Sequence, residues 1–288
     1  MKSPANSSVA VLGLGIIGSR ARARMVAAGW QVKCWNRTPR GLPGETATPE
    51  DAACGVGLIA IYLKDGPAVR AIMERLSPTL LPGQTLLNHS TVDLATTLWL
   101  ADECARVGCG FLDVPFTGSK LAAENGQLVY YTGGSHALLE EVEPLLRATC
   151  RELVPCGGIG TATVVKLVTN LISACTVQAL AEALALATSH GVSAECLTRA
   201  VAGNFCGSPL AAFKLPCMAG GDFDTHFSLD NMRKDSRYAL DLARSVGMEV
   251  PAIEAVSERM TELCDRGLGG LDYCAVAKAY QPDSQSRA

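Results

Sequence analysis

Three glycines near the start of the chain constrain its fold most strongly. They follow the apolar run 9–12 and directly precede a stretch with helical spacing, 17–28. In a strand–turn–helix unit of this kind, the first glycine makes a tight turn, the second lets the backbone approach a pyrophosphate, and the third lets helix and strand pack closely. The phosphates then lie at the helix N-terminus. We therefore predict a dinucleotide-binding turn, with an ordinary glycine-rich turn as the alternative; its residues are Gly13, Leu14, Gly15, Ile16, Ile17 and Gly18.

Short apolar runs alternate with helical patterns through the first half of the chain. The runs predict strands over 9–12, 31–35, 57–63, 85–88, 110–114, 128–132 and 152–155. The helical patterns cover 17–28, 67–76, 96–107 and 137–148. This alternation favours βαβ units and a doubly wound parallel sheet. Segment 40–48 is rich in glycine and proline, so we expect a loop or a stunted helix there.

The pattern changes after Gly160. Residues 161–190 contain neither proline nor glycine and predict one long apolar helix, buried on several sides. Further helices are predicted over 193–202, 208–219, 228–246 and 251–266. We therefore expect an α/β nucleotide-binding domain over 1–160 and an all-helical domain over 161–288, joined by the long helix, with a frayed tail at 281–288.

Composition excludes several classes of partner. With 25 basic and 28 acidic residues, a net charge of −3 gives no case for binding nucleic acid or an anionic membrane. The apolar stretch 171–187 carries Gln178 and Glu182, so it predicts no membrane span. Twelve scattered cysteines without a C-x-x-C pair indicate a reduced, cytoplasmic protein, and four unclustered histidines predict no metal site. A charged fraction of only 18% suggests a homo-oligomer.

The end of the second strand bears on the type of cofactor. An NAD site usually places an acidic residue about 20 residues after the turn, but none occurs between Gly18 and Glu45. Instead Arg37 can contact a 2′-phosphate, with Asn36 and Thr38 as further donors. This predicts NADPH; the alternative is a solvent-facing arginine.

The first helix also carries three arginines where small residues normally pack. These are Arg20, Arg22 and Arg24. We expect them to be solvated on the outer face, with phosphate contact as the alternative.

Polar residues with possible chemistry occur on the long helix and at strand ends. Lys166 and Asn170 are four residues apart and share one helix face, so Lys166 is either a proton donor or a snorkelling lysine. Thr117, Gly118 and Ser119 follow a strand and suit a substrate carboxylate. Near two other strand ends we place Leu63 and Thr91 beside the cofactor, and expect a structural role for His89 rather than a catalytic one.

Together these motifs resemble the β-hydroxyacid dehydrogenase family, which includes 3-hydroxyisobutyrate dehydrogenase, over residues 10–279. Segment 113–118 looks like its substrate-binding motif, with Thr117 where a serine is usual. Segment 160–170 looks like its catalytic motif, which implies that Lys166 is the acid/base and Asn170 orients the substrate. Segment 227–235 looks like its cofactor-side motif, which implies that Lys234 reaches the nicotinamide. The resemblance implies a Rossmann-like domain, a helical domain, and dimers or tetramers.

Within the family, segments 35–38 and 118–126 look most like the NADPH-dependent glyoxylate and succinic semialdehyde reductases. This implies hydride transfer between NADPH and a small aldehyde or keto acid. Segment 36–38 is also similar to the imine reductases, which usually lack a lysine at position 166. A non-catalytic NADPH-binding sensor is a further alternative, which the presence of Lys166, Asn170 and Lys234 disfavours.

Overall fold

The structure, a computed structural model, describes residues 8–280 and divides into two compact units, 1–166 and 167–288. The boundary lies within one long helix, α7 (Thr161–Ser189), whose first residues belong to the first unit. Its uninterrupted course matches the helix predicted over 161–190. The tail predicted to fray lies outside the described residues.

The first unit is built on a sheet of eight strands in the order β2-β1-β3-β4-β5-β7-β6, with β8 paired to β7. The strands are β1 (Ser8–Leu12), β2 (Gln31–Trp35), β3 (Leu58–Ile61), β4 (Thr85–Asn88), β5 (Gly110–Asp113), β6 (Phe116–Thr117), β7 (Leu128–Gly133) and β8 (Cys150–Gly157).

The predicted doubly wound α/β sheet is confirmed, although the sheet is mixed rather than parallel at every pairing. Strands β1 to β5 pair in parallel, but β7 pairs antiparallel with β5 and with β6. A parallel pairing needs a crossover connection, which is usually a helix. The chain between β5 and β7 instead forms β6 and the short helix α5 (Lys120–Glu124), so β7 returns in the opposite direction.

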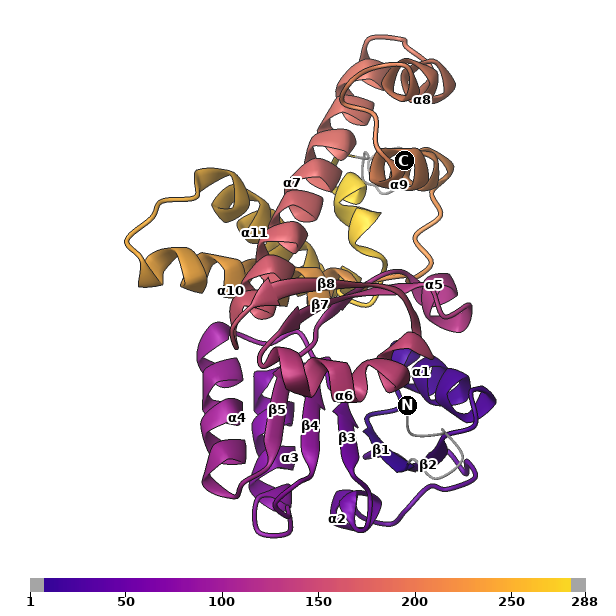
Figure 1. Cartoon of the computed structure of the whole chain (residues 1–288). Helices are drawn as coiled ribbons and strands as arrows, with labels where there is room; N and C mark the ends of the chain where they lie inside the picture. Colours follow the sequence, from indigo (N-terminus) through magenta and orange to yellow (C-terminus); the bar gives the residue numbers. More distant parts are fainter. Residues whose placement is uncertain (1–7, 281–288) are drawn as a thin grey trace. The chain divides into compact units, whose positions relative to one another are not determined.

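Helices cover both faces of this sheet because its strands are apolar on both sides (Figure 1). Val9 and Val11 of β1 pack in one buried cluster with residues of α1 and α6, while Ala10 and Leu12 pack in a second with α2, α3 and α4. Residues 40–48 form a loop, as predicted, and α2 begins only at Pro49. The helices are α1 (Ile16–Ala27), α2 (Pro49–Ala53), α3 (Gly66–Leu76), α4 (Leu94–Arg106) and α6 (His136–Arg147).

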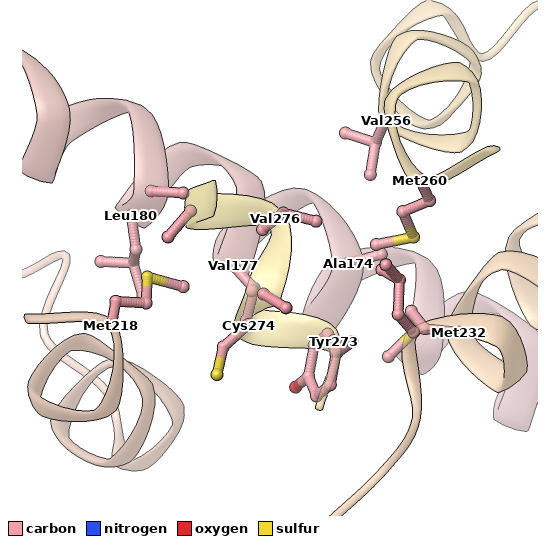
Figure 2. Close-up of a cluster of buried hydrophobic side chains, with 14 of the residues drawn as sticks. Ala174, Val177, Leu180, Met218, Met232, Val256, Met260, Tyr273, Cys274 and Val276 are labelled. Atoms are coloured by element: carbon pink, nitrogen blue, oxygen red, sulfur yellow. The ribbon is translucent and has the colours of Figure 1, made fainter. Parts of the chain in front are cut away.

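The second unit is all-helical and packs around α7 (Figure 2). Ala174, Val177 and Leu180 of α7 meet buried methionines of α9, α10 and α11 in one apolar cluster. The cluster also contains a buried 3-10 helix, Tyr273–Tyr280, which the sequence did not predict. The remaining elements are α8 (Ala194–Ala202), α9 (Pro209–Gly220), α10 (Leu229–Ser245), α11 (Pro251–Leu263) and a π-helical turn (Cys264–Leu268).

Helix α7 is less buried than its apolar composition predicted. Val168, Ile172 and Leu186 are 39%, 61% and 65% exposed, and a third (33%) of its most apolar window is buried. By length and composition alone this helix could cross a membrane. This is weak evidence for a membrane span, because the core helices of globular proteins can be equally long and apolar. Two of its buried amide nitrogens have protein partners: Asn170 Nδ2 donates to Asp235, and Gln178 Nε2 donates to Tyr280.

A buried ion pair holds the segment that leads into α10. Lys214 Nζ lies 2.7 Å from Asp272 Oδ1, and both side chains are almost inaccessible to water. The other carboxylate oxygen accepts hydrogen bonds from the backbone N–H groups of His226 and Phe227. Burial alone would raise the pKa of Asp272, but hydrogen bonds from Cys274 and Lys214 and the positive charge of Lys214 lower it. A charged Asp272 therefore fixes the start of α10.

Candidate functional site

The glycine turn between β1 and α1 has the tight geometry that the sequence predicted. Gly13 has φ +97°, and a side chain there would place its Cβ 2.2 Å from the carbonyl oxygen of Tyr62. A Cβ on Gly18 would lie 2.0 Å from the carbonyl oxygen of Gly13. Packing of strand, turn and helix therefore requires both glycines.

Gly15 differs from the other two glycines because open space surrounds it. A Cβ at Gly15 meets no atom within 4 Å. Gly15 is also the N-cap of α1, and among residues 8–280 no side chain caps this helix end. The first N–H groups of α1 are thus directed at an open cradle, which suits a phosphate. The turn fits the pyrophosphate of a dinucleotide.

Asn36, which was predicted to donate a hydrogen bond to the 2′-phosphate, forms hydrogen bonds with the protein backbone. Its Oδ1 accepts the N–H of Leu14 at 2.9 Å, and its Nδ2 donates to the carbonyl of Thr38 at 2.8 Å. Asn36 therefore braces the glycine turn against the end of β2. Arg37 and Thr38, the other two predicted donors, are exposed at the same strand end.

Arg22 is not solvated, so the prediction for this arginine was wrong. It is 9% exposed, and its guanidinium donates to Cys34 Sγ and to the carbonyl of Pro43. The loop 40–46 packs on β2, with Cys34 N–H bonded to the carbonyl of Gly44. The loop takes the place of a crossover helix, and the long side chain of Arg22 fills the space beneath it. By contrast, Arg24 is exposed, as predicted.

Leu63 borders the glycine turn, whereas His89 is part of the core. Leu63 Cδ2 would lie 3.0 Å from a Cβ on Gly13, and Leu63 N–H bonds to Ser90 Oγ, one residue before the half-buried Thr91. His89 stacks on the ring of Tyr62 at 4.4 Å, and burial lowers its pKa to about 3. The neutral ring therefore donates from Nδ1 to the carbonyl of Val114, 2.8 Å away. His89 has the structural role that we expected.

The segment after β5 presents the three residues predicted to hold a carboxylate. Thr117 and Gly118 are exposed, and Gly118 has φ +137°, a conformation that side chains disfavour. Ser119 is the N-cap of α5, where its oxygen accepts the N–H of Ala122 at 3.3 Å. Its hydroxyl hydrogen can still be donated to a ligand.

The aspartate at the start of this motif is directed inward, to α7. Asp113 is fully buried; its Oδ2 accepts the N–H of Thr163 at 2.7 Å, and its Oδ1 accepts the hydroxyl of Thr163 at 2.9 Å. Burial raises the pKa of Asp113 to about 6, although the hydrogen bonds from Thr163 oppose this shift.

Lys166 and Asn170 lie one helical turn apart on α7, and each is 8% exposed. Within the second unit, Asn170 Nδ2 donates to Asp235 Oδ2 at 2.7 Å. The other oxygen of Asp235 lies 2.6 Å from Lys234 Nζ. One buried carboxylate thus orients the amide of Asn170 and the ammonium of Lys234.

Asp235 is a site residue that the sequence reasoning missed. The one feature of the sequence that could have indicated Asp235 is its position beside Lys234 in segment 227–235. Sequence spacing alone does not show that Asp235 bonds to Asn170 on another helix. Across residues 8–280, no three His, Cys, Asp or Glu side chains come together as metal ligands.

Comparison with known proteins identifies the family. The NAD binding domain of 6-phosphogluconate dehydrogenase matches residues 8–158, and the NAD-binding domain of NADP-dependent 3-hydroxyisobutyrate dehydrogenase matches residues 160–280. The chain is 29% identical over 282 residues to glyoxylate/succinic semialdehyde reductase 2 of Arabidopsis thaliana, covering 94% of this chain and 79% of that protein.

Solved structures agree on the fold. A 3-hydroxyisobutyrate dehydrogenase of Mycobacterium tuberculosis with L-serine matches with a TM-score of 0.88 and 23% identity, covering 96% of this chain and 99% of that one. An imine reductase from Pseudomonas sp. matches with a TM-score of 0.64 and 21% identity, covering 96% and 99%.

The two family models and the named relative together show an oxidoreductase with a nicotinamide cofactor. The chain belongs to the β-hydroxyacid dehydrogenase family, as the sequence motifs predicted.

The glycine turn yields a prediction that separates ligand binding from folding. Gly15→Ala adds a methyl group where only a ligand would meet it, so we expect an unchanged melting temperature and an affinity for the nicotinamide dinucleotide weakened by about tenfold or more. The matched variant Gly18→Ala should instead lower the melting temperature, because its methyl group meets the backbone of Gly13. Calorimetry and fluorescence titration measure the two effects. A Gly15→Ala protein that binds the nicotinamide dinucleotide with normal affinity would contradict the assignment of the cradle.

Asp113 predicts a pH dependence of stability. Its pKa is raised in the folded protein, so the folded state holds the proton more tightly than the unfolded state does. The stability from this group is complete below about pH 4, the ordinary value for Asp, and is lost as the pH rises through about 6. Relative to Asp113→Asn, the wild-type melting temperature should therefore fall from pH 4.5 to 7 and then level off. A difference that does not vary with pH would contradict the raised pKa.

Proposed function

We propose that the protein is an NADPH-dependent reductase of small aldehyde or keto acids, such as succinic semialdehyde or glyoxylate. The observation that carries this proposal is the pair Lys166 and Asn170, both buried on one face of α7, with the amide of Asn170 oriented by Asp235. The printed name of the Arabidopsis relative supports the substrate class.

In this proposal the cofactor is held by the glycine turn and by the end of β2. The N–H groups at the start of α1 bind the pyrophosphate. Leu63 and Thr91 lie beside the bound cofactor. Arg37, exposed and without a neighbouring acid in segment 19–44, binds the 2′-phosphate in the bidentate manner that suits a guanidinium. The family resemblance implies that Lys234, whose ammonium pairs with Asp235, reaches the nicotinamide.

The substrate carboxylate is bound by the hydroxyls of Thr117 and Ser119 and by the backbone of Gly118. Asn170 orients the substrate carbonyl. Its Nδ2 donates to Asp235, and this hydrogen bond fixes the orientation of the whole planar amide group. Bound NADPH supplies a hydride to the carbonyl carbon. Lys166 donates a proton from Nζ to the carbonyl oxygen, which completes the hydroxyl group, and water then reprotonates the amine. General acid catalysis by a positioned side chain of this kind increases the reaction rate by about 10²- to 10⁴-fold.

We further propose that the protein is a homo-oligomer, a dimer or a tetramer. The exposed apolar side chains of α7, Val168, Ile172 and Leu186, support this proposal, because water rarely faces so many large apolar groups on one helix.

Removal of Lys166 tests the chemical step. Lys166→Ala should lower kcat by about 10² to 10⁴ through loss of the proton donor. The dissociation constant for NADPH should stay within about twofold, because the cofactor contacts remain. Lys278→Ala, which removes a lysine over the ring of Phe223 in the second unit, is the matched control. Turnover would be followed by NADPH absorbance with glyoxylate, succinic semialdehyde and one cyclic imine.

The outcomes of this panel separate the alternatives. Reduction of an aldehyde acid that needs Lys166 supports the proposal. Reduction of the imine alone would make the protein an imine reductase. NADPH binding without turnover of any substrate would favour a sensor. Unimpaired turnover by Lys166→Ala would refute the catalytic assignment.

The choice of cofactor is tested at Arg37. A charge-assisted pair contributes about 1.5–3 kcal/mol. Arg37→Asp should therefore reduce the ratio of kcat/KM for NADPH to that for NADH by about 10- to 100-fold. Arg151→Asp makes the same change of charge on the exposed face of β8 and should leave the ratio unchanged. An unaltered ratio in Arg37→Asp would exclude a 2′-phosphate contact.

A further inference from the structure

The first turn of α7 is capped by a residue from the sheet. The first N–H groups of a helix lack partners within the helix and are usually satisfied by a neighbouring side chain. Here Thr163 N–H and Thr163 Oγ1 both donate to Asp113, which lies 50 residues earlier at the end of β5. β5 lies between β4 and β7, inside the sheet. The start of α7 is therefore fastened to a rigid strand.

A second threonine extends this contact to α4. Thr97 Oγ1 and Thr163 Oγ1 lie 2.8 Å apart. Because a carboxylate only accepts, Thr163 donates its hydroxyl hydrogen to Asp113 and accepts one from Thr97. The side chains of Thr97 and Asp113 are fully buried, and Thr163 is 3% exposed. Water cannot replace any of these hydrogen bonds, so losing one partner leaves an unsatisfied polar group.

The position of Thr163 determines the position of Lys166. Lys166 follows three residues later, about 4.5 Å along the helix axis and on a neighbouring part of the same face. A shift of the first turn would move its ammonium by a similar amount. Misplacement of a reacting group by about 1 Å can cost about 10²-fold in rate.

We propose that Asp113 and Thr163 are positioning residues for proton transfer: their hydrogen bonds hold the first turn of α7 where Lys166 can protonate the substrate. This inference rests on the proposed function of Lys166. It gives the aspartate of segment 113–118 a role separate from the carboxylate contacts of Thr117 to Ser119.

Thr163→Val tests the inference, because it removes the hydroxyl and retains both the branched shape and the backbone N–H bond to Asp113. We expect kcat to fall by about 10- to 100-fold, with KM and NADPH affinity within about twofold of wild type. The solvent deuterium isotope effect on kcat should rise, because proton transfer becomes slower relative to the other steps. Amide hydrogen exchange in the cofactor-free protein should accelerate at residues 163–166. Thr163→Ser should restore all of these values.

Thr188→Val is the matched control, since this threonine lies near the other end of α7 and bonds to the carbonyl of Leu184. It should leave kcat and the isotope effect unchanged. If Thr163→Val does not fold, Thr97→Val removes the outer hydrogen bond alone and should show a smaller change in the same direction.

Two results would overturn the inference. One is a Thr163→Val enzyme with the kcat and isotope effect of wild type. The other is a loss of kcat matched by a loss of folded protein at an unchanged isotope effect, which would indicate a purely structural role. Failure of the proposed function is distinguishable, because Lys166→Ala would then retain turnover whatever the behaviour of Thr163→Val.

Discussion

The hydrogen bonds that Asp113, at the end of β5, accepts from Thr163 are the interaction on which the position of the first turn of α7 depends. The chain keeps a carboxyl group in a fully buried position, and this burial raises the pKa of Asp113 because it disfavours the charged form. An apolar residue there would avoid that cost, but it could not bind both the N–H and the hydroxyl of Thr163. Buried polar groups of this kind contribute geometric specificity more than stability.

The three glycines of the turn between β1 and α1 have different structural roles. Gly13 and Gly18 are required by backbone packing, whereas Gly15 leaves the end of α1 open to a ligand. Asn36 braces the turn from the end of β2, and Arg22 supports the loop that follows. Asn36, which the sequence predicted as a donor to the 2′-phosphate, therefore shapes the turn, while Arg37 is exposed at the same strand end.

In the helical unit, one carboxylate contacts two side chains of the proposed site. Asp235 accepts from Asn170 and pairs with Lys234, so both are oriented before any ligand arrives. Such preorganisation reduces the reorganisation needed in the reaction and is a large part of enzymatic rate enhancement. The ion pair of Lys214 and Asp272 supports this arrangement by fixing the start of α10, the helix that carries Asp235.

Local patterns in the sequence determined most of the elements. Alternating apolar runs and glycine punctuation are short-range signals, so strands β1 to β5, helix α7 and the dinucleotide turn could be predicted within a few residues. The motifs around Lys166 and Lys234 also indicated the family.

What only the tertiary structure decided are the contacts between residues far apart in the chain. These include the antiparallel return of β7, the burial of Arg22 under a loop, the bond of Asp235 to Asn170 and the capping of α7 by Asp113. A side chain's spacing within its own element shows which face it occupies. Its partner across 50 or 65 residues depends on how the elements pack, which no local pattern contains.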